Sequence, residues 1–310
     1  MNSLTKNKRL IGTLCGIAAA VCYGTNPLGA LKLYQEQMTP NCVLFYRFSL
    51  AWVIIAMVTI VRKESLKITK KEFLSLTVLG LMFIISSLSL YLSFLYLAAG
   101  VASTILFVYP VMTAAIMALF FHERTSFKTI AAIILSLTGV VLLYWKGKAD
   151  HLSPLGVVLV LISALSYAVY IIVMNRSQLK MSSFKINFYV LFYCALGMVI
   201  YSIATATPLT LPASPTSWFY VGWLAIVPAI FALVLMVYAA KYIGSTPTAI
   251  LGALEPLTAV LIGIFVFNES FSLRLALGIL LILSSVIIIA LPQKRRLPST
   301  SLDAPPSKCD

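Results

Sequence analysis

The most constraining feature of this sequence is the apolar run at residues 244–272, which carries one carboxylate, Glu255, in its middle, directly before Pro256, and a second, Glu269, near its end. The run is long enough to cross a membrane, since a spanning helix needs about 20 apolar residues. An ionisable group at the centre of such a helix costs at least about 2.5 kcal/mol. We therefore expect Glu255 to face protein or a water-filled cavity rather than lipid.

This run has a counterpart about 146 residues earlier, at residues 100–126, in which Tyr109-Pro110 takes the place of Glu255-Pro256. Gly12 and Gly156 align at nearly the same offset. Apolar helices resemble one another by composition alone, but an offset that stays nearly constant over several segments favours a true repeat. The sequence therefore predicts two copies of one unit.

Composition places the chain in a membrane. Hydrophobic residues make up 61% of the sequence and charged residues 10%, whereas a soluble domain has about 25% charged residues. The net charge of +14 does not indicate nucleic acid as a partner, because the basic residues lie between apolar runs. The cysteines lack metal-ligand spacing, so we expect no metal site, no disulfide framework and no cofactor.

Ten apolar segments of spanning length follow one another along the chain. They are Leu10–Leu31, Asn41–Val61, Phe73–Leu97, Ala102–Phe121, Lys128–Trp145, Pro154–Met174, Ile186–Ala206, Trp218–Ala240, Pro247–Phe267 and Leu273–Leu291. We expect residues 10–145 and 154–291 to form two five-helix repeats, residues 1–9 an N-terminal extension, and residues 292–310 a disordered tail.

Basic residues are distributed unevenly between the connecting loops. With the N-terminus inside, 18 Lys and Arg residues fall on the cytoplasmic side and 4 on the other side, and Arg47 lies within a span. Positive loops stay cytoplasmic, so both termini are expected in the cytoplasm, in a plasma or inner membrane. The first apolar run also has features of a signal peptide. Because this run pairs with a later one in the repeat, we expect that it is not cleaved and forms the first transmembrane helix.

Because five helices are an odd number, the second repeat must enter the membrane from the opposite side. Inverted repeats of this kind are frequent in transporters, where the substrate binds near the midplane between the repeats. The fold class predicted is an all-α integral membrane protein of ten transmembrane helices arranged as two inverted five-helix repeats.

Several short motifs resemble the EamA-type branch of the drug/metabolite transporter (DMT) superfamily. They are CYGTNPLGALK, FYRFSLA, YLSFLYLAAGVAST, ALSYAVYIIVMNR, VYAAKYIGSTPTAILGALEPLTAVLIGIFVFNES and the Phe-x-Glu that ends each of the two runs compared above. The resemblance covers Leu10 to Leu291. It implies ten helices, a central cavity between the repeats, and movement of small metabolites, commonly export of amino acids or related compounds. One departure is Tyr109-Pro110, which replaces an acidic residue in the first repeat.

Glu255 and Arg47 are the charged candidates for substrate binding. Thr248, Gly252, Glu255 and Ala259 share one helical face, and a carboxylate on such a face either lines a cavity or serves as a structural partner. Arg47 lies roughly 9 Å into its helix at 1.5 Å per residue. It can face the cavity as counter-charge to Glu255 or snorkel to the outer interface.

The remaining candidates for the lining are polar or aromatic. They are Tyr23 and Asn26 in the first helix, Ser93 in the third, Tyr109 in the fourth, and Tyr167 and Tyr170 in the sixth. Pro27 after Asn26 is expected to kink the first helix and free backbone carbonyls. The alternative for each tyrosine is interhelical packing or an interfacial belt, and for Ser93 it is close helix packing.

The function predicted is transport of a small-molecule substrate across the lipid bilayer by alternating access, with efflux of an amino acid or related compound favoured. One central carboxylate and one guanidinium suit a zwitterion better than a phosphate ester. Export of a neutral drug-like compound and a receptor or scaffold role are the alternatives. No residues have the spacing of an enzyme site. Proton coupling, exchange, facilitated diffusion and a homodimer all remain open.

Overall fold

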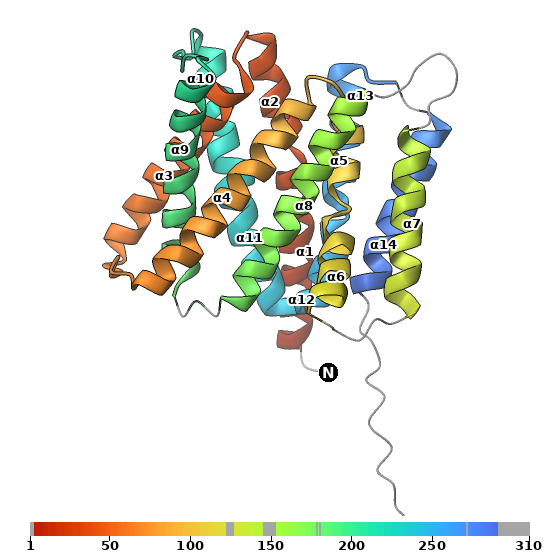
Figure 1. The fold of residues 1–310 in the computed structure, drawn as a ribbon. Helices are drawn as coiled ribbons and strands as arrows, with labels where there is room; N and C mark the ends of the chain where they lie inside the picture. Colours follow the sequence, from red (N-terminus) through yellow and green to blue (C-terminus); the bar gives the residue numbers. More distant parts are fainter. Residues whose placement is uncertain are drawn as a thin grey trace, which may run out of the picture.

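The computed structural model describes residues 3–121, 127–144, 153–177, 179, 181–270 and 272–290. The elements are α1 Ser3–Gly24, α2 Asn26–Gln35, α3 Pro40–Val61, α4 Lys70–Ser93, α5 Ala99–Leu106, α6 Tyr109–Phe120, α7 Phe127–Tyr144, α8 Pro154–Arg176, α9 Ser183–Ala204, α10 Pro215–Ile226, the π-helical turn η1 Val227–Phe231, α11 Ala232–Ile243, α12 Ser245–Gly252, α13 Leu254–Phe267 and α14 Leu273–Ala290. The long helices run in roughly one direction and its reverse (Figure 1), and several spans are built from two or three shorter elements. The predicted tail, residues 292–310, lies outside the described residues.

Apolar length accounts for these helices. Seven helical stretches are long and apolar enough to cross a membrane, and three shorter apolar helices, α7, α13 and α14, complete the set. The ten-helix fold is thereby confirmed. Local signals set several helix starts: Thr69 and Glu72 form a capping box at the start of α4, and proline stands in the first turn of α3, α8 and α10.

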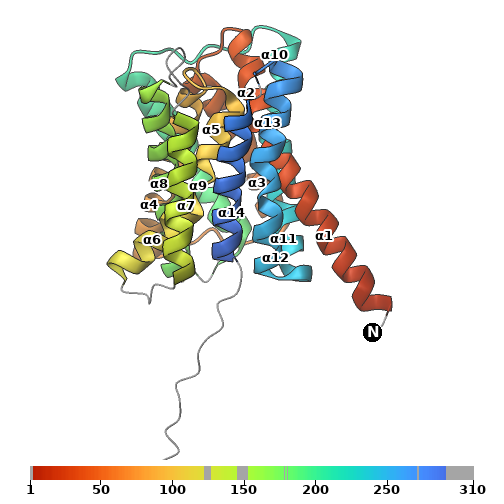
Figure 2. The same cartoon turned by 90° about the vertical axis from the view of Figure 1, so that its right-hand side faces the viewer.

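The helix pairs that join the two repeats come in matched sets: for a contact between two spans, the equivalent contact exists with the repeats interchanged. The first repeat runs from α1 to α7 and the second from α8 to α14. Helix α4 packs on α8 as α11 packs on α1, and α4 packs on α9 as α10 packs on α3. The pairs α3–α9 and α7–α14 each join equivalent helices of the two repeats, and α5–α13 joins the equivalent fourth and ninth spans. Helices α7 and α14 lie side by side in Figure 2. This pattern is what two inverted copies of one unit produce.

Two aligned glycines show the same symmetry at atomic scale. A Cβ built on Gly12 would lie 2.6 Å from the Cβ of Tyr242, and one built on Gly156 would lie 2.9 Å from the Cβ of Tyr96. Tyr96 and Tyr242 are themselves about 146 residues apart. Glycine is therefore needed at both places because the helices approach too closely for a side chain.

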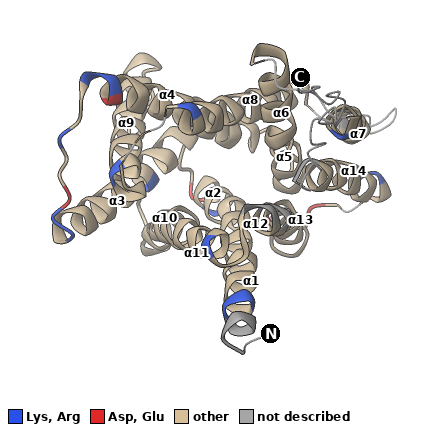
Figure 3. Cartoon of the chain, turned by 90° about the horizontal axis from the view of Figure 1, so that it is seen from below, with Lys and Arg blue, Asp and Glu red and all other residues tan. Residues whose placement is uncertain are grey.

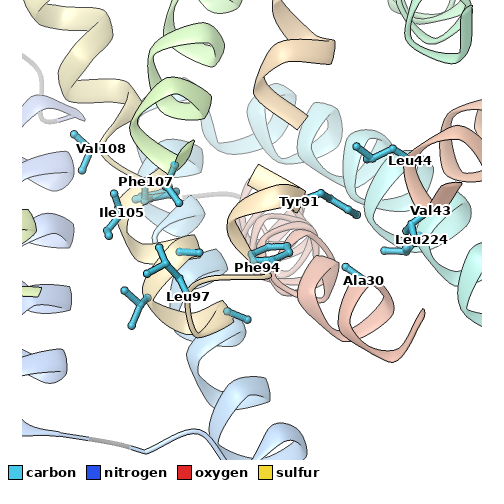
Figure 4. Close-up of a cluster of buried hydrophobic side chains, with 14 of the residues drawn as sticks. Ala30, Val43, Leu44, Tyr91, Phe94, Leu97, Ile105, Phe107, Val108 and Leu224 are labelled. Carbon is cyan, nitrogen blue, oxygen red and sulfur yellow. The ribbon is translucent and has the colours of Figure 1, made fainter. Parts of the chain in front are cut away.

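A buried apolar cluster joins helices of both repeats. Tyr91 and Phe94 at the end of α4 lie between Leu44 of α3 and Phe107 beyond α5, and all four are buried (Figure 4). The outer perimeter instead exposes large apolar side chains, such as Phe265 at 79%. Outward apolar surface of this kind suits lipid rather than water.

Charged side chains gather at one end. Seen from below in Figure 3, the end at which α1 begins carries most of the described Lys and Arg residues. We call this the lower end. The opposite end, which holds the loops at 36–39, 94–98, 205–214 and 268–270, is the upper end (Figure 1). The chain is thus a multi-pass membrane protein with one strongly basic end.

Candidate functional site

The two repeats break their helices at equivalent places. In the fourth span α5 gives way to α6 after Phe107, directly before Tyr109-Pro110, and in the ninth span α12 gives way to α13 at Ala253, directly before Glu255-Pro256. The sequence predicted single unbroken helices at both places, and the structure corrects this. Proline removes a backbone donor and clashes with the preceding turn. Matched interruptions in the two halves are the strongest pointer to a transporter's binding site.

The first span is also interrupted, at Thr25, as Pro27 predicted. The freed carbonyls there are satisfied locally, because the Thr25 hydroxyl donates to the Cys22 carbonyl at 2.7 Å and the Asn26 amide donates to the Tyr23 carbonyl at 3.0 Å. Trp223 Nε1 donates to Thr25 Oγ1 at 3.3 Å and ties α10 to this break. The Oδ1 atom of Asn26 is buried and has no partner among the described residues.

Glu255 lies in the first turn of α13, where the break places it beside α1. A Cβ built on Gly24 would lie 2.6 Å from the Glu255 carbonyl oxygen, so α1 and α13 are in backbone contact here. The Glu255 carboxylate is close enough to Tyr23, Tyr109 and Tyr167 to interact electrostatically with each. It is only half-buried. The Glu255 side chain thus lies among side chains of both repeats without being fully covered by them.

Aromatic rings form a continuous wall beside this carboxylate. The ring centroids of Tyr109 and Tyr167 are 4.7 Å apart in an edge-on contact. Tyr167 and Tyr170 stack at 5.7 Å, and Phe83 of α4 follows at 5.4 Å from Tyr170. The structure therefore brings three predicted residues, Tyr23, Tyr109 and Tyr167, close to Glu255, and Tyr170 joins them through its stack on Tyr167.

Arg47 also interacts electrostatically with Tyr23. Its side chain is 9% exposed, and Nη1 donates to the Tyr91 hydroxyl at 2.7 Å. The snorkelling alternative is therefore wrong, because the guanidinium is buried in the helix assembly. Among the described residues Arg47 has no carboxylate at ion-pairing distance, and its Nε is buried without a partner. Arg47 and Glu255 do not form an ion pair.

A family model decides the identity of this arrangement. The model described as "EamA-like transporter family" matches residues 10–145 and 154–291. The chain belongs to the EamA-like transporter family. It is a membrane transporter, and the matched breaks and the tyrosine-lined carboxylate lie where the two matched segments meet.

Individual relatives agree with this assignment. The EamA-like chain is 26% identical over 295 residues to "Uncharacterized inner membrane transporter YicL" of Salmonella typhimurium, covering 92% of the chain and 97% of the relative. It is 22% identical to "Uncharacterized transporter YcbK" of Bacillus subtilis, covering 86% and 88%. An "Uncharacterized transporter" of Archaeoglobus fulgidus is 29% identical over 61% of the chain, and the match spans 66% of that relative.

A solved structure described as "Crystal structure of protein" superposes with a TM-score of 0.63 at 18% sequence identity. The match covers 89% of this EamA-like chain and 95% of the other. At this identity the likeness shows the fold alone. It agrees with the helix pairing described above.

One predicted residue of this transporter is placed differently. Ser93 has no exposed surface, and its hydroxyl donates to the Leu90 carbonyl of its own helix at 2.6 Å. Ser86 on the same helix bonds across to Ser163 of α8 at 3.2 Å. These contacts favour the close-packing alternative for the serine stripe of α4.

Sequence reasoning missed Phe83 and Tyr91, which contact predicted residues, and Trp223, which bonds to Thr25 beside Asn26. Phe83 and Tyr91 lie eight residues apart in α4, and Tyr91 is on the opposite side of the helix from Ser86 and Ser93. Nothing in the sequence distinguished them from the many other aromatic residues of the spans. Their roles depend on which helix faces meet, which local periodicity does not contain.

Proposed function

We propose that this transporter exports an amino acid or a closely related zwitterion by alternating access. The observation that carries the proposal is Glu255, a carboxylate without an ion pair or hydrogen bond among the described side chains. It stands at a helix break and is surrounded by tyrosines from both repeats. An unpaired charge in a membrane interior is costly. A cationic group of the substrate would remove that cost.

The surrounding groups support a zwitterion. Tyrosine faces attract an ammonium group electrostatically, and Tyr167 and Tyr170 offer stacked faces beside Glu255. Arg47 has a buried donor, Nε, that still lacks a partner, and a guanidinium can bind a carboxylate with two parallel hydrogen bonds. Tyr23 interacts electrostatically with both Glu255 and Arg47. The substrate would therefore lie along Tyr23, with its ammonium toward Glu255 and its carboxylate toward Arg47.

The repeat architecture supports alternating access. Two inverted units can rock against each other and expose one central site first to one side and then to the other. The basic lower end supports a cytoplasmic location for it, with both termini inside and the upper end facing out of the cell. Export would then be release of the substrate through the upper end.

A neutral amphipathic compound is the second candidate, because the wall formed by Phe83, Tyr109, Tyr167 and Tyr170 needs no charge to bind an apolar ligand. Glu255→Gln separates the two candidates, since it keeps the shape and removes the charge. Thermal stabilisation of the purified protein by a panel of amino acids and neutral compounds measures binding. Flux into sealed vesicles of reconstituted protein measures transport and distinguishes a transporter of these ligands from a receptor.

For a zwitterion we expect amino acids to stabilise the parent, and Glu255→Gln to lose that stabilisation and the flux while folding normally. Glu72→Gln, an exposed carboxylate in a capping box at the lower end, is the charge-matched control and should retain both. The proposal fails if folded Glu255→Gln and Arg47→Gln proteins still carry amino acids at the parent rate. Stabilisation of the parent by neutral compounds alone would favour the second candidate.

A further inference from the structure

The upper end of α13 carries a second carboxylate, Glu269, which the binding site does not use. Helix α13 ends at Asn268 in a left-handed conformation, with φ 53°, and the chain turns back so that the Glu269 N–H donates to the Gly263 carbonyl at 2.9 Å. This is a common way for a helix to end. It brings the Glu269 side chain back toward the body of the helix rather than out into solvent.

The Glu269 carboxylate is bonded to the other repeat. It accepts hydrogen bonds from the backbone N–H groups of Ala99 at 2.6 Å and Gly100 at 3.3 Å, at the start of α5. Helix α5 has no side-chain cap of its own at Ala98. Orphan N–H groups and the positive end of the helix dipole both favour a carboxylate at this position. Glu269 of the second repeat therefore caps a helix of the first.

Two glycines make this contact possible. A Cβ on Gly263 would overlap the Glu269 carboxylate, and a Cβ on Gly100 would lie 2.9 Å from Cα of Val260. Helices α5 and α13 are thus packed backbone to backbone beneath the bonded carboxylate. Met117 occupies the place of Gly263 in the first repeat, about 146 residues earlier, so the second repeat alone has a glycine at this position.

The capped contact and the binding site share their helices. Helix α13 has 14 residues, about 20 Å at 1.5 Å per residue, with Glu255 in its first turn and Glu269 just past its last. Helix α5 runs from the capped end to the break before Tyr109. Opening a path from the site to the upper end requires α5 and α13 to separate there, which breaks both hydrogen bonds of Glu269.

We propose that Glu269 is a latch that holds the upper end closed and is released once in each transport cycle. The inference rests on the alternating access proposed above. Glu269 also lines a surface cavity with Tyr96, Ser153 and Arg274, so water reaches the latch and can take over its hydrogen bonds when it opens. When water replaces a protein partner in a hydrogen bond, the net change in free energy is small, so the bond can break and re-form.

The test measures opening directly and needs no substrate. Thr104 is fully buried and lies four residues beyond Gly100 on α5, with its hydroxyl bonded to the Gly100 carbonyl at 2.7 Å. Thr104→Cys, in a background with the five native cysteines replaced by alanine, reports separation of α5 from α13. An impermeant thiol reagent is applied in turn to each face of sealed vesicles, and the labelling rate of Cys at this position is measured.

Two variants break the latch by different means. Glu269→Gln removes the charge, and Gly263→Ala displaces the carboxylate without changing its charge. Each should raise labelling from the upper face by about tenfold, the change expected for loss of a charge-assisted hydrogen bond. Gly222→Ala is the matched control, because a Cβ there meets nothing within 4 Å. It should label at the parent rate.

The latch is refuted if neither variant changes the labelling rate, if only one of two folded variants changes it, or if Gly222→Ala raises it equally. If one variant fails to fold, as judged by its melting temperature, the other decides. If the protein does not bind amino acids, the labelling result still stands, because the labelling experiment adds no substrate. A failure of the latch would leave binding at Glu255 intact.

Discussion

Several buried polar atoms of the spanning region have no hydrogen-bond partner among the described residues. They are Oδ1 of Asn26, Nε of Arg47, Nε1 of Trp52 and Oγ of Ser136, and the carboxylate of Glu255 likewise has no ion pair there. Buried polar groups in proteins are nearly always paired, and an unpaired one costs more in a membrane than in a soluble core. Asn26 begins α2 at the first break and Glu255 lies in the first turn of α13 at another. Asn26, Arg47 and Glu255 belong to the candidate site, whereas Trp52 of α3 and Ser136 of α7 do not.

At this scale we predict that Tyr91→Phe destabilises the protein. The Tyr91 hydroxyl accepts a hydrogen bond from Arg47 Nη1. Removing this hydroxyl leaves the buried guanidinium with one hydrogen-bond acceptor fewer. We expect the free energy of unfolding to fall by about 1–3 kcal/mol, seen as a fall of several degrees in the melting temperature in detergent. Tyr193→Phe, whose hydroxyl has no hydrogen bond in the described part of the chain, should change little; equal melting temperatures for both would contradict the role of Tyr91.

Helix breaks and glycine contacts explain the site at the scale of elements. The break before Glu255 lets α13 start beside α1, and Gly24 lets the two backbones touch. The break before Tyr109 turns α6 toward α8 and brings Tyr109 to Tyr167. The π-helical turn η1, which contains Pro228, bends the eighth span next to α1, and π-turns are frequent at functional sites.

We predict that Gly24→Ala separates α1 from α13. An added Cβ would lie 2.5 Å from Thr258 Cβ and 2.6 Å from the Glu255 carbonyl oxygen, and a backbone atom cannot rotate away. We expect a fall of several degrees in melting temperature, because overpacking typically costs about 1–3 kcal/mol, together with weaker amino-acid stabilisation. Gly222→Ala serves again as control. Unchanged stability and unchanged ligand response in Gly24→Ala would show that the contact is dispensable.

The largest helix contacts of the molecule join one repeat to the other. Equivalent spans pair across the symmetry: α3 with α9, α7 with α14, and the fourth span with the ninth through α5 and α13. Connecting loops add to this at both ends: Asn41 of α3 bonds to Thr207 at 3.1 Å above, and Lys185 of α9 bonds to the Lys67 carbonyl at 2.6 Å below.

The prediction for the whole molecule concerns its orientation in the membrane. Cys309 lies outside the described residues, so the expectation rests on the charge pattern alone. With the other cysteines replaced, Cys309 should be protected from an impermeant thiol reagent in intact cells and react once the membrane is permeabilised. Labelling in intact cells would reverse the orientation, and with it the direction assigned to the upper end.

The sequence alone predicted those features of the structure that are determined within one segment of the chain. Membrane insertion acts on each segment separately, since about 20 apolar residues suffice to span, and loop charge acts on each loop. Ten spans, two inverted repeats and a polar site near Glu255 therefore followed from apolar run lengths, from the offset of about 146 residues and from one costly carboxylate.

Tertiary structure decided the partners. Arg47 bonds to Tyr91 rather than to Glu255, Ser93 bonds within its own helix, and Glu269 caps α5 of the other repeat. Each outcome depends on which faces of distant helices meet and at what depth. In lipid no hydrophobic force drives one apolar face against another, so small residues and polar contacts select the pairing. Those contacts join residues far apart in the chain, and no local pattern specifies them.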